Sequence, residues 1–167
     1  MNCKNLKNVE FPAKLETISR NAFMGSGLET ATLPASLRTV CQGVFAKCEY
    51  LKKACFGEGL EVLGRDEYPR NEKFYNGIFG ENALEEVWLP STLKRIEYAT
   101  FNRCKRLKKV LLPDSLETIS WGCFANTGLE ELILPKNVKT VGPFAFYTCK
   151  RLRSVQLNEG LEKLGEE

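Results

Sequence analysis

The residues that could do chemistry in this 167-residue chain are its seven cysteines and its adjacent carboxylates. A cysteine acts as a nucleophile or a metal ligand in its thiolate form, which a neighbouring histidine or another cation normally stabilises. The chain contains no histidine, so only lysine or arginine could play that part. The composition therefore excludes every Cys-His or Ser-His mechanism, and we predict that the chain is not an enzyme.

The carboxylates and glycines also lack a catalytic or phosphate-binding arrangement. Glu85 with Glu86, and Glu130 with Glu131, are adjacent on expected strands, where neighbouring side chains point to opposite faces and do not converge. The glycines form neither a Walker motif nor Gly-x-Gly-x-x-Gly at the start of a helix. The sequence therefore predicts no cofactor.

Composition and charge narrow the class of protein further. Apolar residues make up 43% and charged residues 27%, as in a folded domain. The net charge of +3 gives no argument for a nucleic-acid partner. The apolar runs are far shorter than the ~18 residues of a membrane helix, so we predict no membrane insertion. Residues 1–6 lack the apolar stretch of a signal peptide.

One segment recurs seven times, with its second residue spaced by 22 or 23 residues except for one interval of 33. The seven copies are Phe11-Pro12-Ala13-Lys14-Leu15, Leu33-Pro34-Ala35-Ser36-Leu37, Phe56-Gly57-Glu58-Gly59-Leu60, Leu89-Pro90-Ser91-Thr92-Leu93, Leu112-Pro113-Asp114-Ser115-Leu116, Leu134-Pro135-Lys136-Asn137-Val138 and Leu157-Asn158-Glu159-Gly160-Leu161. The long interval carries an 11-residue insertion near 65–75. Such an insertion forms a binding loop, or it packs Phe74 or Tyr75 onto the shell, and the sequence favours neither reading.

A Leu-x-x-apolar-x-apolar pattern precedes each copy, and its alternating end predicts a short strand. After each copy come a Leu-x-x-Ile pattern and then a phenylalanine. No single turn can bury so many apolar side chains, so neighbouring turns must stack around a shared core.

This pattern, with Leu-Pro and Ala-Phe at fixed offsets, resembles the BspA-type (Treponema-type) leucine-rich repeat, and residues 107–124 and 129–149 match it almost position by position. We therefore predict a single leucine-rich-repeat solenoid over residues 1–167, of the α/β class and right-handed. It should have about seven turns of 22–23 residues, with mostly short β-strands and short helical turns around Ala-Phe. The resemblance further implies a cell-surface or secreted, adhesin-like binding module, with extracellular-matrix proteins such as fibronectin and fibrinogen among its partners.

The turns alternate between two types. In the long type a Leu follows the phenylalanine by six residues, and a Cys stands three residues before that Leu. In the short type the Leu follows the phenylalanine by five residues, usually directly after a Gly. The cysteines of the long type, Cys3, Cys48, Cys104 and Cys149, then lie two turns apart, at about 10 Å for ~4.8 Å per turn. A disulfide needs Cα atoms within about 7 Å, so we predict free thiols and no metal cluster.

Charges alternate from turn to turn in two columns. The residue after the strand leucine is Lys7, Glu29, Lys52, Glu85, Lys108, Glu130 and Arg153. The residue after the second leucine is Glu16, Arg38, Glu61, Lys94, Glu117, Lys139 and Glu162. Slipping the stack by one turn would place like charges together, so we interpret these ladders as devices that fix the register.

The strand residues that should face solvent give the candidate ligand-binding site. In four successive turns this outward column is apolar, and the column two residues earlier carries alternating charge. The predicted site residues are Cys55, Trp88, Leu111, Ile133, Lys53, Glu86, Lys109 and Glu131. An apolar patch with a polar rim around a tryptophan is typical of a protein-binding surface. The alternatives are that the chain covers this face itself, or that β-propensity alone selected these residues.

Two further features bear on partners. A basic cluster could attract acidic glycans or anionic proteins, but the alternating glutamates dilute its charge and favour a plain solvated face. The cluster contains Lys105, Arg106, Lys108, Lys109, Lys150, Arg151 and Arg153. The terminal turns show no polar capping repeat, so we expect exposed strand edges. The prediction is therefore non-catalytic protein binding through the strands, with a structural or self-associating segment of a longer array as the alternative. Self-association would use the solenoid ends or the strand face.

Overall fold

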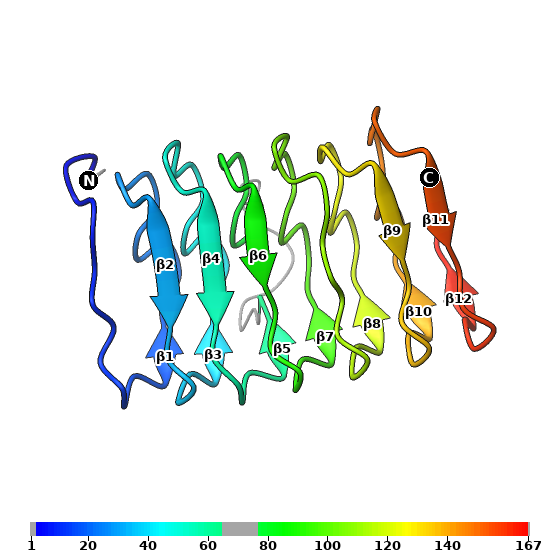
Figure 1. Ribbon diagram of the computed structural model, residues 1–167, viewed down its shortest axis with the longest axis horizontal. Coiled ribbons are helices and arrows are strands. Elements are labelled where there is room, and N and C mark those ends of the chain that lie inside the picture. The colour runs from blue at the N-terminus through cyan, green and yellow to red at the C-terminus, as the bar shows by residue number, and fades with distance from the viewer. Residues whose placement is uncertain (1–2, 65–76, 167) are drawn as a thin grey trace.

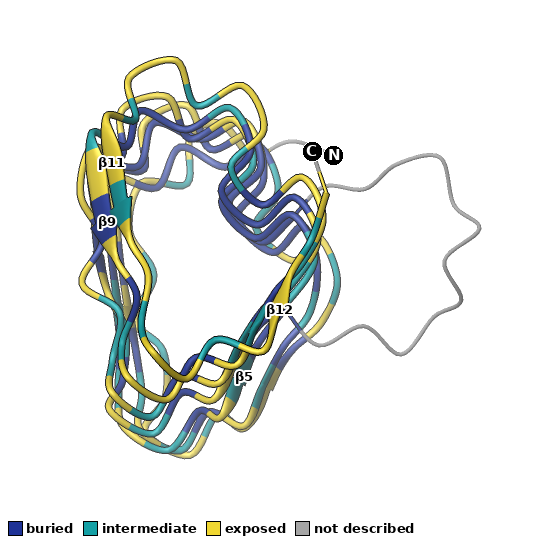
Figure 2. Cartoon of the chain, turned by 90° about the vertical axis from the view of Figure 1, so that its right-hand side faces the viewer, coloured by how far each residue is buried: buried dark blue, intermediate teal, exposed yellow. Residues whose placement is uncertain are grey.

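The computed structural model describes residues 3–64 and 77–166, which coil into turns stacked side by side along one long axis (Figure 1). The predicted insertion near 65–75 lies outside the described residues. The strands run across the long axis, and they form two columns on different sides of the coil (Figure 2).

The first column contains the strands that precede the Leu-Pro segments. Its members are β2 (Thr30–Leu33), β4 (Lys53–Phe56), β6 (Glu86–Trp88), β9 (Glu131–Ile133) and β11 (Ser154–Gln156). They pair in parallel as β2-β4-β6 and as β9-β11. The register aligns Thr32 with Cys55 and Cys55 with Trp88, so equivalent positions of successive repeats stack directly. The predicted stacking of equivalent positions is confirmed.

The second column contains the strands that follow the Leu-Pro segments. Its members are β1 (Thr17–Ile18), β3 (Thr39–Val40), β5 (Val62–Leu63), β7 (Arg95–Ile96), β8 (Thr118–Ile119), β10 (Thr140–Val141) and β12 (Lys163–Leu164). Here β1 pairs with β3, and the other five form one parallel sheet in the order β5-β7-β8-β10-β12. A second short strand therefore follows each Leu-Pro segment, and these seven strands bound six complete turns.

The prediction of short helical turns around Ala-Phe is wrong: the described residues contain no helix. In this part of each turn the backbone N–H groups bond to the adjacent turn, as the N–H groups of Ala99, Phe101 and Arg103 do with the carbonyls of Trp121, Cys123 and Ala125, each at 2.9 Å. Residues two before and two after the phenylalanine take positive φ, 51° at Ala99 and 64° at Arg103. A right-handed helix has negative φ throughout, so this inter-turn ladder replaces it.

A ladder of stacked phenylalanines forms the centre of the core. The stack contains Phe23, Phe45, Phe79, Phe101, Phe124 and Phe146. Neighbouring ring centroids lie 5.3 Å to 6.2 Å apart, and the rings are within 14° of parallel. The strand leucines and valines pack against these rings. One continuous hydrophobic core thus runs through all the turns, as the repeat predicts.

The two types of turn interlock through cysteine and glycine. In the long type the thiols of Cys48 and Cys104 donate to the carbonyls of Phe23 and Phe79 at 3.1 Å and 3.0 Å. In the short type Gly128 lies so close to the preceding long turn that a Cβ would overlap the carbonyl oxygen of Lys105. The alternation of types is therefore a packing requirement between neighbouring turns.

The charge ladders are present with different degrees of contact. In the second ladder Glu61 lies 3.3 Å from Lys94, and Lys139 lies 3.9 Å from Glu162. In the first ladder the backbones adjoin, but Glu85 pairs with Arg106 at 3.5 Å instead of with its ladder neighbours. These pairs are exposed, so each contributes only about 0.2–1 kcal/mol to stability.

Candidate functional site

The outward surface of the first strand column, named here the strand face, exposes three large apolar side chains in successive turns. Trp88 is 60% exposed, Leu111 73% and Ile133 62%, while Cys55 is half-buried. Their neighbours along the chain, such as Val87, point into the core, because side chains alternate along a strand. The structure thus places the four predicted apolar residues in adjacent turns on one surface, and described residues of this chain leave three of them open.

The predicted charged residues lie beside this stripe and neutralise one another. Lys53 lies 3.3 Å from Glu86, and Lys109 lies 3.8 Å from Glu131. The Lys53 ammonium also lies 5.5 Å from the centroid of the Trp88 ring, within the range of a cation–π interaction. The paired rim charges therefore leave little net charge for an external partner.

The sheet of the strand face is split at Leu111, which the sequence did not indicate. Residues 107–112 form no strand, and within the described chain no backbone hydrogen bond joins residues 109–112 to β6 or β9. Figure 1 shows this segment without an arrow between β6 and β9. The repeat pattern of Leu107 to Leu112 equals that of the paired turns, so no residue type marks the split.

A groove follows the split on both sides of Leu111. Between β6 and this segment it has a volume of about 490 Å³, with Trp88, Leu111 and Leu112 in its walls. Towards β9 it continues with about 270 Å³, bordered by Leu111 and Ile133. The split therefore turns a flat stripe into a recess with apolar walls.

The opposite rim of the groove contains residues that the sequence did not single out as a site. The hydroxyl and the N–H of Ser91 donate to the Glu58 carboxylate at 2.8 Å and 3.0 Å. These hydrogen bonds hold the pKa of the Glu58 carboxyl below its usual value. In this copy Gly57 stands where five of the seven copies have Pro, which is the signal that could have drawn attention to Glu58.

All seven cysteines are free thiols, as predicted. Burial raises the pKa of Cys104 to about 12, and burial together with the Glu97 carboxylate raises that of Cys123 well above its usual value. Residues 3–64 and 77–166 contain no group of cysteines and carboxylates that could hold a metal ion. The buried environments of Cys104 and Cys123 suit packing.

Thiol labelling tests the assignment of inert cysteines. With a pKa of about 12, Cys104 has roughly one thiolate in ten thousand molecules at pH 8. In the folded chain iodoacetamide should therefore alkylate exposed Cys3 first, and should reach Cys104 and Cys123 only after unfolding, as followed by peptide mass spectrometry. All seven should react at similar rates in denaturant. Fast labelling of Cys104 or Cys123 in the folded chain would contradict this and favour an activated thiol.

The parallel stack of short turns, with its phenylalanine ladder and open strand face, defines a leucine-rich-repeat solenoid. A sequence model of the BspA type leucine rich repeat region matches residues 1–69 and 72–167 in six copies. The chain belongs to this family.

Several solved structures share the fold. A leucine-rich repeat protein from Bacteroides ovatus is 27% identical, has a TM-score of 0.81, and aligns with 98% of this chain and 40% of its own. The T. pallidum leucine rich repeat protein is 22% identical, with a TM-score of 0.63 over 83% of this chain and 68% of its own. The chain thus spans less than half of the Bacteroides protein. A comparison with curated proteins finds no match. No helix of the described residues has the length and apolar character to cross a membrane.

Proposed function

We propose that the chain is a non-catalytic binding module that holds a protein segment on its strand face. The observation that carries this proposal is the row of Trp88, Leu111 and Ile133, each at least 60% exposed, along a groove between adjacent turns. Exposed apolar surface of this size has a cost in water that a partner would remove. A central tryptophan with a polar rim supplies the anchor that protein interfaces use.

The pairing of the rim charges defines the chemistry of that partner. Because Lys53 with Glu86 and Lys109 with Glu131 are already neutralised, a charged segment would gain little from the rim. An uncharged apolar segment lying along the solenoid axis would contact all three apolar residues in turn. Its affinity should change little with salt, since burial of apolar area dominates.

A surface or secreted location, with an extracellular-matrix protein as the partner, forms part of this proposal. Its support is the membership in the BspA type family, together with the lack of any feature of the described site that requires a small substrate. Fibronectin and fibrinogen are therefore the first probes to use.

Self-association is the second candidate, because the exposed row of Trp88, Leu111 and Ile133 could also pack against a second copy of the chain. Head-to-tail stacking of two copies would, however, place Arg153 beside Lys7, and Glu162 beside Glu16. Like charges in adjacent turns oppose that contact. Self-association through the strand face has no such penalty.

The test combines Trp88→Ala with Leu111→Ser and compares this variant with the native chain and with Tyr50→Ala plus Leu157→Ser. The control alters an exposed aromatic and an exposed leucine away from the groove. Binding to immobilised fibronectin and fibrinogen should fall at least tenfold for the groove variant, about 1.4 kcal/mol, and remain unchanged for the control. The native affinity should differ less than threefold between 50 mM and 500 mM salt, in line with the neutral rim.

Two outcomes would contradict the proposal. Equal loss of binding in both variants would show that the strand face is not the site. A native dimer that the groove variant dissociates, with no binding to either probe, would assign the strand face to self-association. Light scattering distinguishes these states by mass.

A further inference from the structure

The edge of the solenoid that leads into the strands has ridges and recesses that follow the two types of turn. The long turns reach outwards, so Lys105, Arg106 and Lys108 are exposed on one ridge. The intervening short turn is sunk, with Thr127 only 5% exposed and Gly128 buried. The next long turn forms the second ridge, which exposes Lys150, Arg151 and Arg153. Two cationic ridges therefore flank a recess one turn wide.

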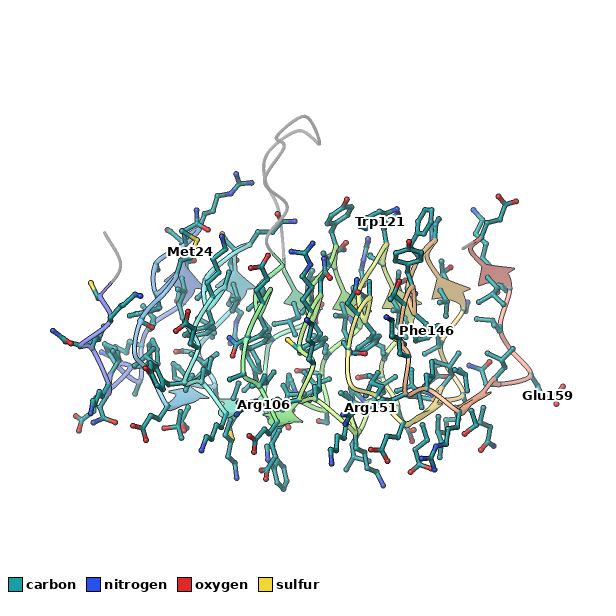
Figure 3. The ribbon with its side chains drawn as sticks, turned by 90° about the horizontal axis from the view of Figure 1, so that it is seen from above. Met24, Arg106, Trp121, Phe146, Arg151 and Glu159 are labelled. Atoms are coloured by element: carbon teal, nitrogen blue, oxygen red, sulfur yellow. The ribbon has the colours of Figure 1, made fainter. Side chains whose placement is uncertain are left out.

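Both ridges belong to one side of the molecule. Figure 3 shows Arg106 and Arg151 along the same edge, on the side away from Trp121. The ridges are two turns apart, which corresponds to about 10 Å at the ~4.8 Å spacing of paired strands. A hollow of about 370 Å³ borders the second ridge alone, with Glu130 and residues 150–153 in its walls.

The cations on this edge outnumber the carboxylates that lie close enough to neutralise them. Among the described residues the carboxylates that meet the ridges are Glu85, 3.5 Å from Arg106, and Glu130 in the recess. Six cations against two carboxylates leave an excess of four, which is larger than the net charge of +3 of the whole chain. In the described part of the chain Lys105, Lys108 and the second ridge form no ion pair.

The composition of the ridges distinguishes between anionic polymers. Arginine and lysine bind sulfate and carboxylate groups through charge-assisted hydrogen bonds. Single-stranded nucleic acids need aromatic side chains on which their bases stack, and Lys105–Lys108 and Lys150–Arg153 contain none. The two ridges lie about 10 Å apart, backbone to backbone, so one linear chain lying over the sunk turn could contact both. A polymer with anionic groups at regular intervals meets both ridges at once.

We propose that the recess between Lys105–Lys108 and Lys150–Arg153 binds a linear anionic polysaccharide, such as a sulfated glycan. The site is separate from the strand-face groove, and the two differ in physical character. Its affinity depends on released counterions and therefore falls steeply with salt, in contrast to binding at the neutral rim of the groove.

The first turns offer a matched control on the same scaffold. There the ridges carry Lys4, Lys7, Lys47 and Lys52, above a recess of about 430 Å³. Glu29 and Glu49 line that recess as well, so its charge is closer to balance. Replacing four lysines there changes the net charge of the chain as much as replacing four cations of the proposed site.

The experiment measures the affinity of heparin by calorimetry for three proteins. These are the native chain, a site variant with Lys105→Gln, Lys108→Gln, Lys150→Gln and Arg151→Gln, and a control variant with Lys4→Gln, Lys7→Gln, Lys47→Gln and Lys52→Gln. The native chain should bind heparin at 150 mM salt, with an affinity that falls as salt rises. The site variant should lose at least tenfold in affinity, and the control less than twofold.

Three results would overturn the proposal. One is no heparin binding by the native chain at 150 mM salt. Another is an equal loss of heparin affinity in both variants, which would mean that only the net charge of the chain matters. The third is displacement of heparin by poly-glutamate or single-stranded DNA at equal charge concentration, which would assign the edge to acidic peptides or nucleic acids. Both variants should have the same midpoint of thermal unfolding as the native chain, which verifies that their fold is intact.

Discussion

Replacing Phe101 with alanine should lower the free energy of unfolding by about 3–5 kcal/mol. The ring is fully buried and lies between Phe79 and Phe124, with centroid distances of 5.6 Å and 5.3 Å. Its removal leaves a cavity in the middle of the stack, and the inter-turn hydrogen bonds on both sides resist collapse into that cavity. Urea unfolding followed by circular dichroism measures the loss.

The matched control is Phe144→Ala. Phe144 is 37% exposed and packs at the surface against Trp121 and Tyr147, with centroids at 5.5 Å and 5.8 Å. We expect a loss of less than about 1 kcal/mol there. If both substitutions cost the same, the phenylalanine ladder is not the centre of the core.

Replacing Gly128 with alanine should cost about 3 kcal/mol of stability, the upper end for overpacking. A Cβ at this position overlaps the carbonyl oxygen of Lys105, which belongs to the backbone of the neighbouring turn. The Gly128 N–H also donates to the carbonyl of Cys104 at 3.3 Å, so the two turns cannot separate without losing a hydrogen bond. The midpoint of thermal unfolding provides the measurement.

Gly160→Ala is the comparison for this second substitution. A Cβ there would lie 3.3 Å from its nearest neighbour, the carbonyl oxygen of Lys136, and φ is outside the left-handed region. A change of less than about 1 kcal/mol is expected. A similar loss at both glycines would mean that the close approach of turns at Gly128 does not limit the packing.

The sequence by itself determined the coil, its register and its core. Residues such as Leu93, Ile96 and Phe101 recur at fixed offsets, and each recurrence requires a neighbour with the same offsets to bury it. The exposure of the outward column could also be predicted from the sequence, because side chains alternate along a strand and Trp88 stands between two apolar positions of the pattern. Both inferences depend only on the periodicity within one turn and between adjacent turns.

The conformation around Ala-Phe depended on contacts that periodicity does not encode. Arg103 and Lys47 adopt positive φ although neither is glycine. Local propensity disfavours that conformation, and the hydrogen bonds from each turn to the next offset its cost. The sequence of one turn by itself therefore predicts a helix, whereas stacking of the turns produces a ladder of hydrogen bonds between them.

The groove and the ridges were likewise decided by the tertiary structure. The segment from Leu107 to Leu112 has the same pattern as its paired neighbours, yet it makes no strand, and the recess beside Trp88 follows from that difference. The two cationic ridges are 45 residues apart along the chain, and they flank a common recess only because the short turn between them is sunk. Sequence periodicity fixes which residues share a column, whereas the height and separation of neighbouring turns depend on how their backbones pack.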